Sequence, residues 1–165
     1  MTVYAADKLI AQARVLAAEY RRTMGKPLPG ISNEIAEFDA LKLLQLEPNA
    51  GGEGGYDAID SNRGNKRIQI KSRTIFDETK SGQRVGQLKL DKVWDSVVLV
   101  IMDEDYQPCE IYEAERDDLV EYLDQNSSNR AKRGAMSVAR FKIIGQRVWT
   151  RESGLEEEIW DNQSD

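Results

Sequence analysis

Residues 96–102 read Ser-Val-Val-Leu-Val-Ile-Met, an unbroken apolar run bounded by charged and polar residues. A strand that alternates polar and apolar residues buries one face, whereas an unbroken apolar strand needs cover on both faces. The run is too short to cross a membrane, which takes about 18–20 residues. We therefore expect a central strand in a sheet that is covered on both sides.

Two helices are predicted before this strand. Residues 1–24 are expected to form an alanine-rich N-terminal helix, in which the near-helical spacing of Leu9, Ala13, Leu16 and Tyr20 indicates an amphipathic helix. The Gly- and Pro-containing segment 25–30 breaks this helix. A second helix is expected over 33–46, with Ser32 as its N-cap and with Pro48 following its end. Its apolar face contains Ile35, Phe38, Leu41 and Leu44.

The rest of the chain adds strands on both sides of the buried one. Strands are expected at 56–60, 66–76, 108–115 and, as an edge strand, 147–150; short helices are expected at 116–124 and 138–144, the latter capped by Ser137 and closed by Gly145. This order predicts an α/β sandwich with a central mixed sheet. We expect a single domain over 1–165, with its core in 31–150 and an acidic tail at 152–165.

The composition excludes several kinds of chemistry. The chain has no histidine and a single cysteine, Cys109. Histidine-activated nucleophiles, histidine-ligated zinc, thiolate zinc clusters and intrachain disulfides are thereby excluded. Catalysis would have to use carboxylates, amides, lysine and hydroxyls, which suit Mg²⁺ or Mn²⁺. The start of the chain does not resemble a signal peptide, so we expect a cytoplasmic protein without a membrane anchor.

The charges are sorted along the chain. The net charge is −6, yet bases dominate 62–92 and 130–151, while acids dominate 103–124 and the tail. A basic face of this kind is suited to a phosphate backbone, although a charge run is equally consistent with a solvated surface. The candidate nucleic-acid contacts are Lys66, Arg67, Arg73, Lys132, Arg133 and Arg140.

One constellation carries specific chemistry. Asp57 begins one predicted strand, and Gln69 and Lys71 lie two residues apart on its hairpin partner, so their side chains point from the same face. Without histidine, phosphodiester cleavage needs metal ligands, an activated water and a cation that offsets charge on the phosphate. These three residues can supply that set. Taken singly, each has a plainer explanation, because Asp57 can cap a turn and Gln69 and Lys71 can face solvent.

In order and spacing, residues 31–102 resemble the PD-(D/E)XK nuclease superfamily. The resemblance rests on Asn-Glu-Ile-Ala-Glu in the second helix, Gly-Tyr-Asp-Ala-Ile-Asp, Ile-Gln-Ile-Lys-Ser and the buried strand. It implies a restriction-endonuclease-like fold, with Asp57 and Gln69 as metal ligands and Lys71 as the catalytic lysine. A helix glutamate often completes the site in that family: Glu34 is the first candidate, Glu37 the second, and the loop residue Glu53 a weaker third. Gln69 departs from the family pattern by replacing an acid.

The expectation is therefore an Mg²⁺- or Mn²⁺-dependent DNA endonuclease with Asp57, Gln69, Lys71 and Glu34 in its active site. A homodimer is a natural assembly for cutting both strands. Two alternatives stay open: a catalytically inactive module of the same fold that binds DNA or protein, and an accessory subunit docked through its acidic segments. The sequence does not distinguish DNA from RNA.

Overall fold

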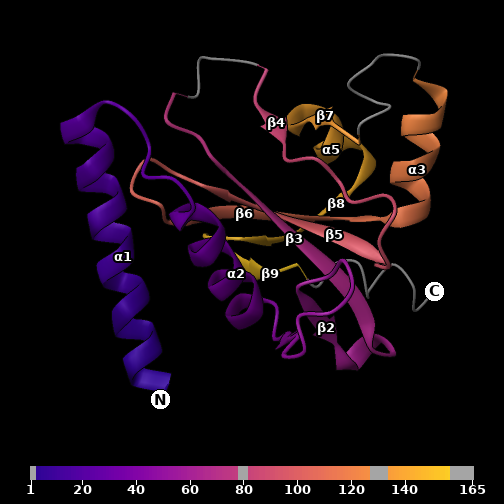
Figure 1. Ribbon diagram of the computed structural model, residues 1–165, viewed down its shortest axis with the longest axis horizontal. Helices are drawn as coiled ribbons and strands as arrows, with labels where there is room; N and C mark the ends of the chain where they lie inside the picture. The colour runs from indigo at the N-terminus through magenta and orange to yellow at the C-terminus, as the bar shows by residue number, and fades with distance from the viewer. Residues whose placement is uncertain (1–2, 78–81, 127–133, 157–165) are drawn as a thin grey trace.

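The computed structural model describes residues 3–77, 82–126 and 134–156, which form an α/β structure with a large mixed sheet (Figure 1). The helices are α1 (Val3–Met24), α2 (Ile31–Leu43), α3 (Arg116–Gln125) and α5 (Val138–Ile144), with a 3-10 turn at Ser61–Arg63. The strands are β1 (Glu47–Pro48), β2 (Ala58–Asp60), β3 (Lys66–Thr74), β4 (Arg84–Val85), β5 (Ser96–Met102), β6 (Pro108–Glu115), β7 (Met136–Ser137), β8 (Gln146–Thr150) and β9 (Gly154–Leu155).

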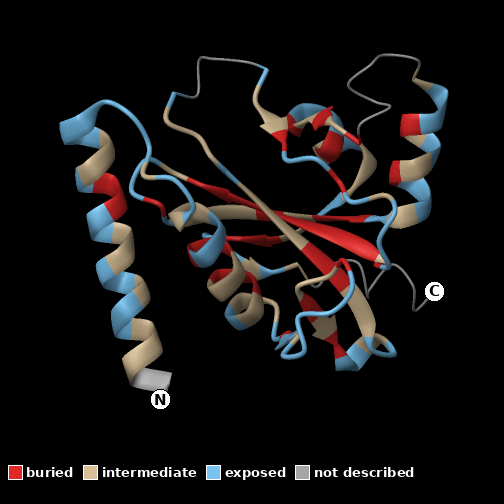
Figure 2. Cartoon of the chain, in the orientation of Figure 1, coloured by how far each residue is buried: buried red, intermediate tan, exposed pale blue. Residues whose placement is uncertain are grey.

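The large sheet has the strand order β1-β2-β3-β5-β6-β8-β9. The strand β5 is parallel to β3 and antiparallel to β6, and every one of its residues is buried (Figure 2). Val98 and Val100 belong to the core shared with α1 and α2, whereas Val97 and Leu99 belong to the core shared with α3 and α5. The prediction of a doubly covered central strand is confirmed.

The helix α1 packs through only part of the predicted face, since Ala13 lies partly buried against the core. Leu9 and Leu16 are about half exposed, at 52% and 54% of their surface, so they are not its inward face. The helix instead packs through its buried alanines Ala17 and Ala18, whose small side chains let it approach closely. No helix in the described part of the chain is long and apolar enough to cross a membrane.

The predicted boundaries of α2 are wrong at both ends. The helix begins at Ile31, because Gly30 at φ 84° turns the chain into it, and Ser32 therefore lies inside the first turn and makes no side-chain cap. The helix ends at Leu43, and Gln45 adopts a left-handed φ of 57°. The chain then enters β1, which contains Pro48.

The C-terminal part of the fold is closer to the prediction. The helix α5 spans Val138–Ile144, and the Ser137 hydroxyl accepts a hydrogen bond of 3.1 Å from the Arg140 N–H. The strand β8 is not an edge strand, because β9 pairs along its outer side. The segment between β3 and β5, where we expected no strand, contains β4, which pairs with β7 in a small second sheet. Residues 157–165 of the acidic tail lie outside the described residues.

Candidate active site

Asp57 lies where the pairing between β2 and β3 ends. Its N–H donates to the Ile68 carbonyl over 2.8 Å, and its carboxylate Oδ2 accepts from the Ile70 N–H over 2.7 Å. One carboxylate oxygen therefore replaces a backbone acceptor for the part of β3 that lies beyond the end of its pairing with β2. The other oxygen, Oδ1, accepts no hydrogen bond from any described residue. The carboxylate therefore binds the neighbouring strand β3 rather than a turn, and its second oxygen is available to a ligand.

Gln69 is buried in β3 and only 2% exposed. Its Nε2 donates to the Gly55 carbonyl over 3.0 Å, which fixes the amide beside the loop that leads to Asp57. Its Oε1 is buried and has no hydrogen-bond partner, a condition shared among the described side chains only by the Thr74 hydroxyl. A buried acceptor without a partner costs about 1–3 kcal/mol. The predicted solvent-facing alternative for Gln69 is therefore excluded.

Lys71 projects from the same face of β3 as Gln69 and is half-buried. Burial lowers the pKa of its ammonium, the positive charge of Lys89 lowers this pKa further, and the charge of Asp57 opposes both effects. Lys71 thus lies within electrostatic reach of Asp57 and of a second cation. The segment containing Gly86 passes next to it, because a Cβ at Gly86 would lie 3.7 Å from Lys71 Nζ.

Glutamates of α2 reach the same region. Burial raises the pKa of Glu37, and the negative charges of Asp57 and then Glu34 raise it further. Glu37 is half-buried and Glu34 is exposed, so Glu37 is the helix glutamate that the structure connects to Asp57. Glu53 is exposed in the preceding loop.

These acids alone do not form a metal cluster. In the described part of the chain, no three histidine, cysteine, aspartate or glutamate side chains converge closely enough to hold a metal ion. A metal bound here would need the Gln69 amide oxygen as well as carboxylates. Amide and carboxylate oxygens together form a donor set that Mg²⁺ and Mn²⁺ accept.

The predicted nucleic-acid contacts have different environments. Lys66 pairs with Glu115, and the Arg67 guanidinium binds Asp95 through two hydrogen bonds of 3.0 and 3.1 Å. These two cations are already neutralised, because strand pairing brings distant acids to them. Arg73 and Arg140 are exposed, and the Arg140 guanidinium lies 5.4 Å from the centre of the Tyr122 ring. Lys132 and Arg133 lie outside the described residues.

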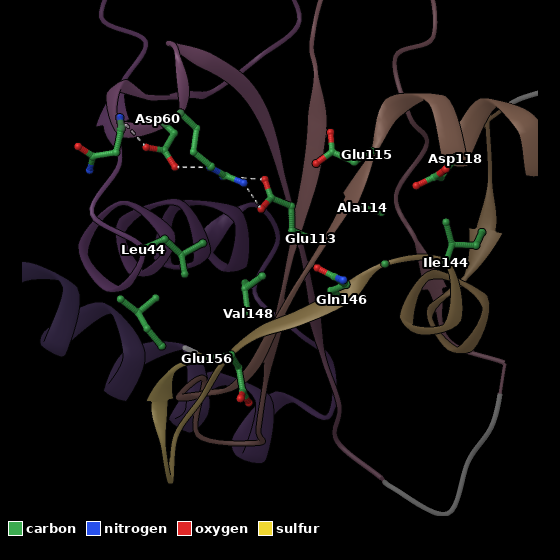
Figure 3. A pocket seen from close by; sticks show the side chains of 14 residues that line it. Leu44, Asp60, Glu113, Ala114, Glu115, Asp118, Ile144, Gln146, Val148 and Glu156 are labelled. Atoms are coloured by element: carbon green, nitrogen blue, oxygen red, sulfur yellow. Dashed lines mark hydrogen bonds and ion pairs between the residues drawn. The ribbon is translucent and has the colours of Figure 1, made fainter. Parts of the chain in front are cut away.

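A cavity of about 840 Å³ lies elsewhere, and neither Asp57, Gln69 nor Lys71 lines it (Figure 3). Arg63 crosses it, binding both oxygens of Glu113 over 2.8 and 2.9 Å and Asp60 over 2.7 Å. The raised pKa of Arg63 follows from these two carboxylates, which outweigh its burial. Because these buried charges are satisfied by one another, we assign the network to stability.

Comparisons with known proteins add no assignment. The chain matches no family model, and a search of curated proteins found no similar sequence. We therefore infer a function from the geometry of Asp57, Gln69, Lys71 and Glu37.

Proposed function

We propose that this protein is a metal-dependent phosphodiester hydrolase that acts on DNA. The observation that carries the proposal is the Gln69 Oε1 atom, which is buried and without a partner in a side chain whose Nε2 is bonded to the loop before Asp57. A cation would satisfy this acceptor and would also relieve the repulsion between Asp57 and Glu37.

Asp57, Gln69 and Glu37 would hold Mg²⁺ or Mn²⁺, with Glu34 at the exposed side. When bound, such an ion supplies positive charge that lowers the pKa of water and offsets charge on a phosphate. The free Oδ1 of Asp57 and the orphaned amide oxygen fit this role, although the neutral amide makes the site less negative than an all-carboxylate one. We therefore expect metal affinity to be modest and to increase in the presence of nucleic acid.

Lys71 would act directly on the reacting groups. Because its pKa is lowered, Lys71 is neutral more often than a solvated lysine is. The neutral amine can orient an attacking water and accept a hydrogen bond from that water. In its charged form it stabilises the phosphate as the water oxygen bonds to phosphorus and the leaving P–O bond breaks.

The arrangement of elements supports the proposed membership of the PD-(D/E)XK superfamily and its restriction-endonuclease-like fold. The hairpin β2–β3 carries the aspartate and the Gln-x-Lys pair, α2 packs behind it, and β3 lies parallel to the buried β5. The proposal includes a cytoplasmic location and a homodimer that cuts both strands of a duplex, for which the oligomeric state in solution is the first check.

The proposal is tested by plasmid nicking in Mn²⁺, together with calorimetric titration of Mn²⁺. Asp57→Asn should lose metal binding and cleavage, whereas Lys71→Met should keep metal binding and lose at least about a hundredfold in rate. Matched controls are Asp117→Asn on the exposed side of α3 and Lys26→Met before α2, and neither should change the rate. Wild-type protein that neither binds Mn²⁺ nor nicks DNA would refute the proposal.

A second candidate is a non-catalytic module of the same fold. The neutral Gln69 and the lack of a three-acid cluster among the described residues favour it, since both weaken metal binding. It predicts DNA binding that is independent of Mn²⁺ and unchanged by Asp57→Asn. The accessory-subunit alternative predicts no salt-sensitive DNA binding.

A further inference from the structure

The segment that crosses beside Lys71 has properties that the proposed reaction does not by itself require. We call residues 84–92 the cationic strap. It passes from β4 to the start of β5 and contacts the active-site elements at two points. Gly86 lies against Lys71, and Lys92 packs against Gly55, whose Cβ, if it had one, would lie 2.1 Å from the Lys92 Cβ. The strap therefore lies next to the residues that flank Asp57 and Gln69.

The strap is held firmly by the rest of the molecule. Val85 pairs with Met136, and Leu88 is 2% exposed with its N–H bonded to the Gly134 carbonyl over 3.0 Å. Arg116 donates to the carbonyl oxygens of Leu90 over 2.7 Å and Lys92 over 2.8 Å, while stacking over Trp94. The Trp94 indole in turn donates to the Lys89 carbonyl over 2.7 Å. The backbone is thus fixed, and its charged side chains are presented from a rigid support.

The cations of this region differ from most others in having no ion-pair partner among the acids that the structure describes. The bases at the start of β3 and in the turn before it, Arg63, Lys66 and Arg67, are neutralised by carboxylates. No described acid forms an ion pair with the bases of the strap and of the C-terminal half of β3, which are Lys71, Arg73, Arg84, Lys89 and Lys92. Asp91 is the acid within the strap, and it is exposed and outnumbered. Asp57 is the carboxylate whose charge reaches Lys71, so the bases outnumber the acids here, and an excess of positive charge attracts an anion.

We infer that the cationic strap binds the sugar–phosphate backbone of a nucleic acid and places one of its phosphates beside Lys71. This inference rests on the proposed function for the identity of the anion. Its geometry rests on the contacts of Gly86 and Lys92, and the proximity of Lys89 to Lys71 agrees with it. It also replaces Lys66 and Arg67, which the sequence favoured, by Arg84 and Lys89.

The test measures binding without divalent metal, so that cleavage plays no part. A fluorescein-labelled duplex of about 20 base pairs is titrated by fluorescence anisotropy between about 50 and 200 mM salt. Arg84→Gln with Lys89→Gln should weaken affinity at least about tenfold and reduce the slope of log affinity against log salt by about 1.8, or about 0.9 for each phosphate that the variant no longer neutralises. Melting temperatures of each variant verify folding.

Matched charge-removing controls separate the strap from general electrostatics. Lys8→Gln with Lys26→Gln removes the same charge from α1 and the turn after it, and Lys66→Gln removes a cation already paired with Glu115. Equal weakening by the first control, or an unchanged salt slope in the strap variant, would overturn the inference, as would wild-type protein that does not bind the duplex. Binding that depends on the strap without any cleavage in Mn²⁺ would overturn the proposed function and leave the inference standing.

Discussion

Ionisation of Glu37 is disfavoured where this residue lies beside the other carboxylates of the site. Its pKa is raised above the ordinary value of 4.5 by burial and by the charges of Asp57 and Glu34. A carboxyl group with a raised folded-state pKa binds protons more tightly in the folded than in the unfolded state. Its effect on stability is therefore absent below about pH 4, and stability declines as pH rises through the folded-state pKa.

Glu37→Gln should accordingly raise the melting temperature near pH 7 and leave it unchanged near pH 4. Saturating Mn²⁺ should raise the melting temperature of the wild type and have a smaller effect on the variant, because the ligand is lost. Glu19→Gln on the exposed face of α1 removes the same charge outside the site and serves as the control. Thermal melts across this pH range provide the measurement, and an equal gain at both pH values would contradict the assignment.

The local sequence pattern predicted which residues share a face of the strand, but not how buried they are or what they contact. The alternation of Gln69 and Lys71 placed both on one face of β3, because strand geometry fixes that relation. The pattern carried no information on the burial of Gln69 or on the pairing of Arg67 with Asp95, since 28 residues separate that pair. Contacts between distant segments arise from the topology of the sheet, which single residues do not encode.

At the scale of elements, the structure depends on how α1 docks. Its Arg14 is 11% exposed, binds both oxygens of Asp39 on α2, one of them over 2.8 Å, and donates to the Tyr106 carbonyl over 2.6 Å. The apolar residues Leu9 and Leu16, on the other hand, remain exposed. The attachment of this helix therefore combines small-residue packing with one buried, oriented ion pair.

Arg14→Met should destabilise the protein by about 3–5 kcal/mol, because the carboxylate of Asp39 remains buried without a counter-charge. The double variant Arg14→Met with Asp39→Leu should recover much of this loss, since neither charge then remains. Urea unfolding monitored by circular dichroism measures both. If the double variant is as unstable as the single one, packing rather than charge attaches α1. Arg22→Met, in an exposed pair with Asp105, should change stability by less than about 1 kcal/mol.

The sequence predicted best those elements whose ends or burial are set by their own residues and immediate neighbours. The helix α5 lies between the Ser137 cap and Gly145 as expected, and the apolar run of β5 required burial on both faces. The start of α2 was misplaced, because the left-handed Gly30 sets it and Ser32 only resembles a cap. The two-residue strands β1, β4, β7 and β9 went unpredicted, since each is defined by its partner rather than by its own residues.

At the scale of the whole molecule, the candidate site lies where several segments meet. The sheet separates two apolar cores, and the site lies at the rim of β3 where β2 ends, with α2 contributing Glu37 and the cationic strap passing beside Lys71. Its geometry therefore depends on how closely the strap and the Asp57 loop approach one another. Gly55 of the loop lies against Lys92 of the strap, and the Gly55 carbonyl also accepts the hydrogen bond from Gln69.

Gly55→Ala tests this dependence. The new Cβ would lie 2.1 Å from Lys92 Cβ and 3.3 Å from the Lys92 backbone Cα, so the loop and the strap must separate. Gly51→Ala in the same loop is the matched control, because its Cβ would meet nothing within 4 Å and both changes reduce the freedom of the unfolded chain equally. Relative to this control, Gly55→Ala should lower the free energy of unfolding by about 1–3 kcal/mol.

The same substitution links packing to function. Because separation displaces the Gly55 carbonyl from Gln69, Gly55→Ala should weaken Mn²⁺ binding and reduce nicking as well as stability, whereas Gly51→Ala should affect none of the three. Adding Lys92→Gly to Gly55→Ala removes the atom that the new methyl group would strike, and should restore metal binding in part. Urea unfolding and Mn²⁺ calorimetry on this series separate the two effects. If Gly55→Ala lowers stability while metal affinity stays unchanged, the amide of Gln69 is not positioned through Gly55, and the strap supports the fold without shaping the site.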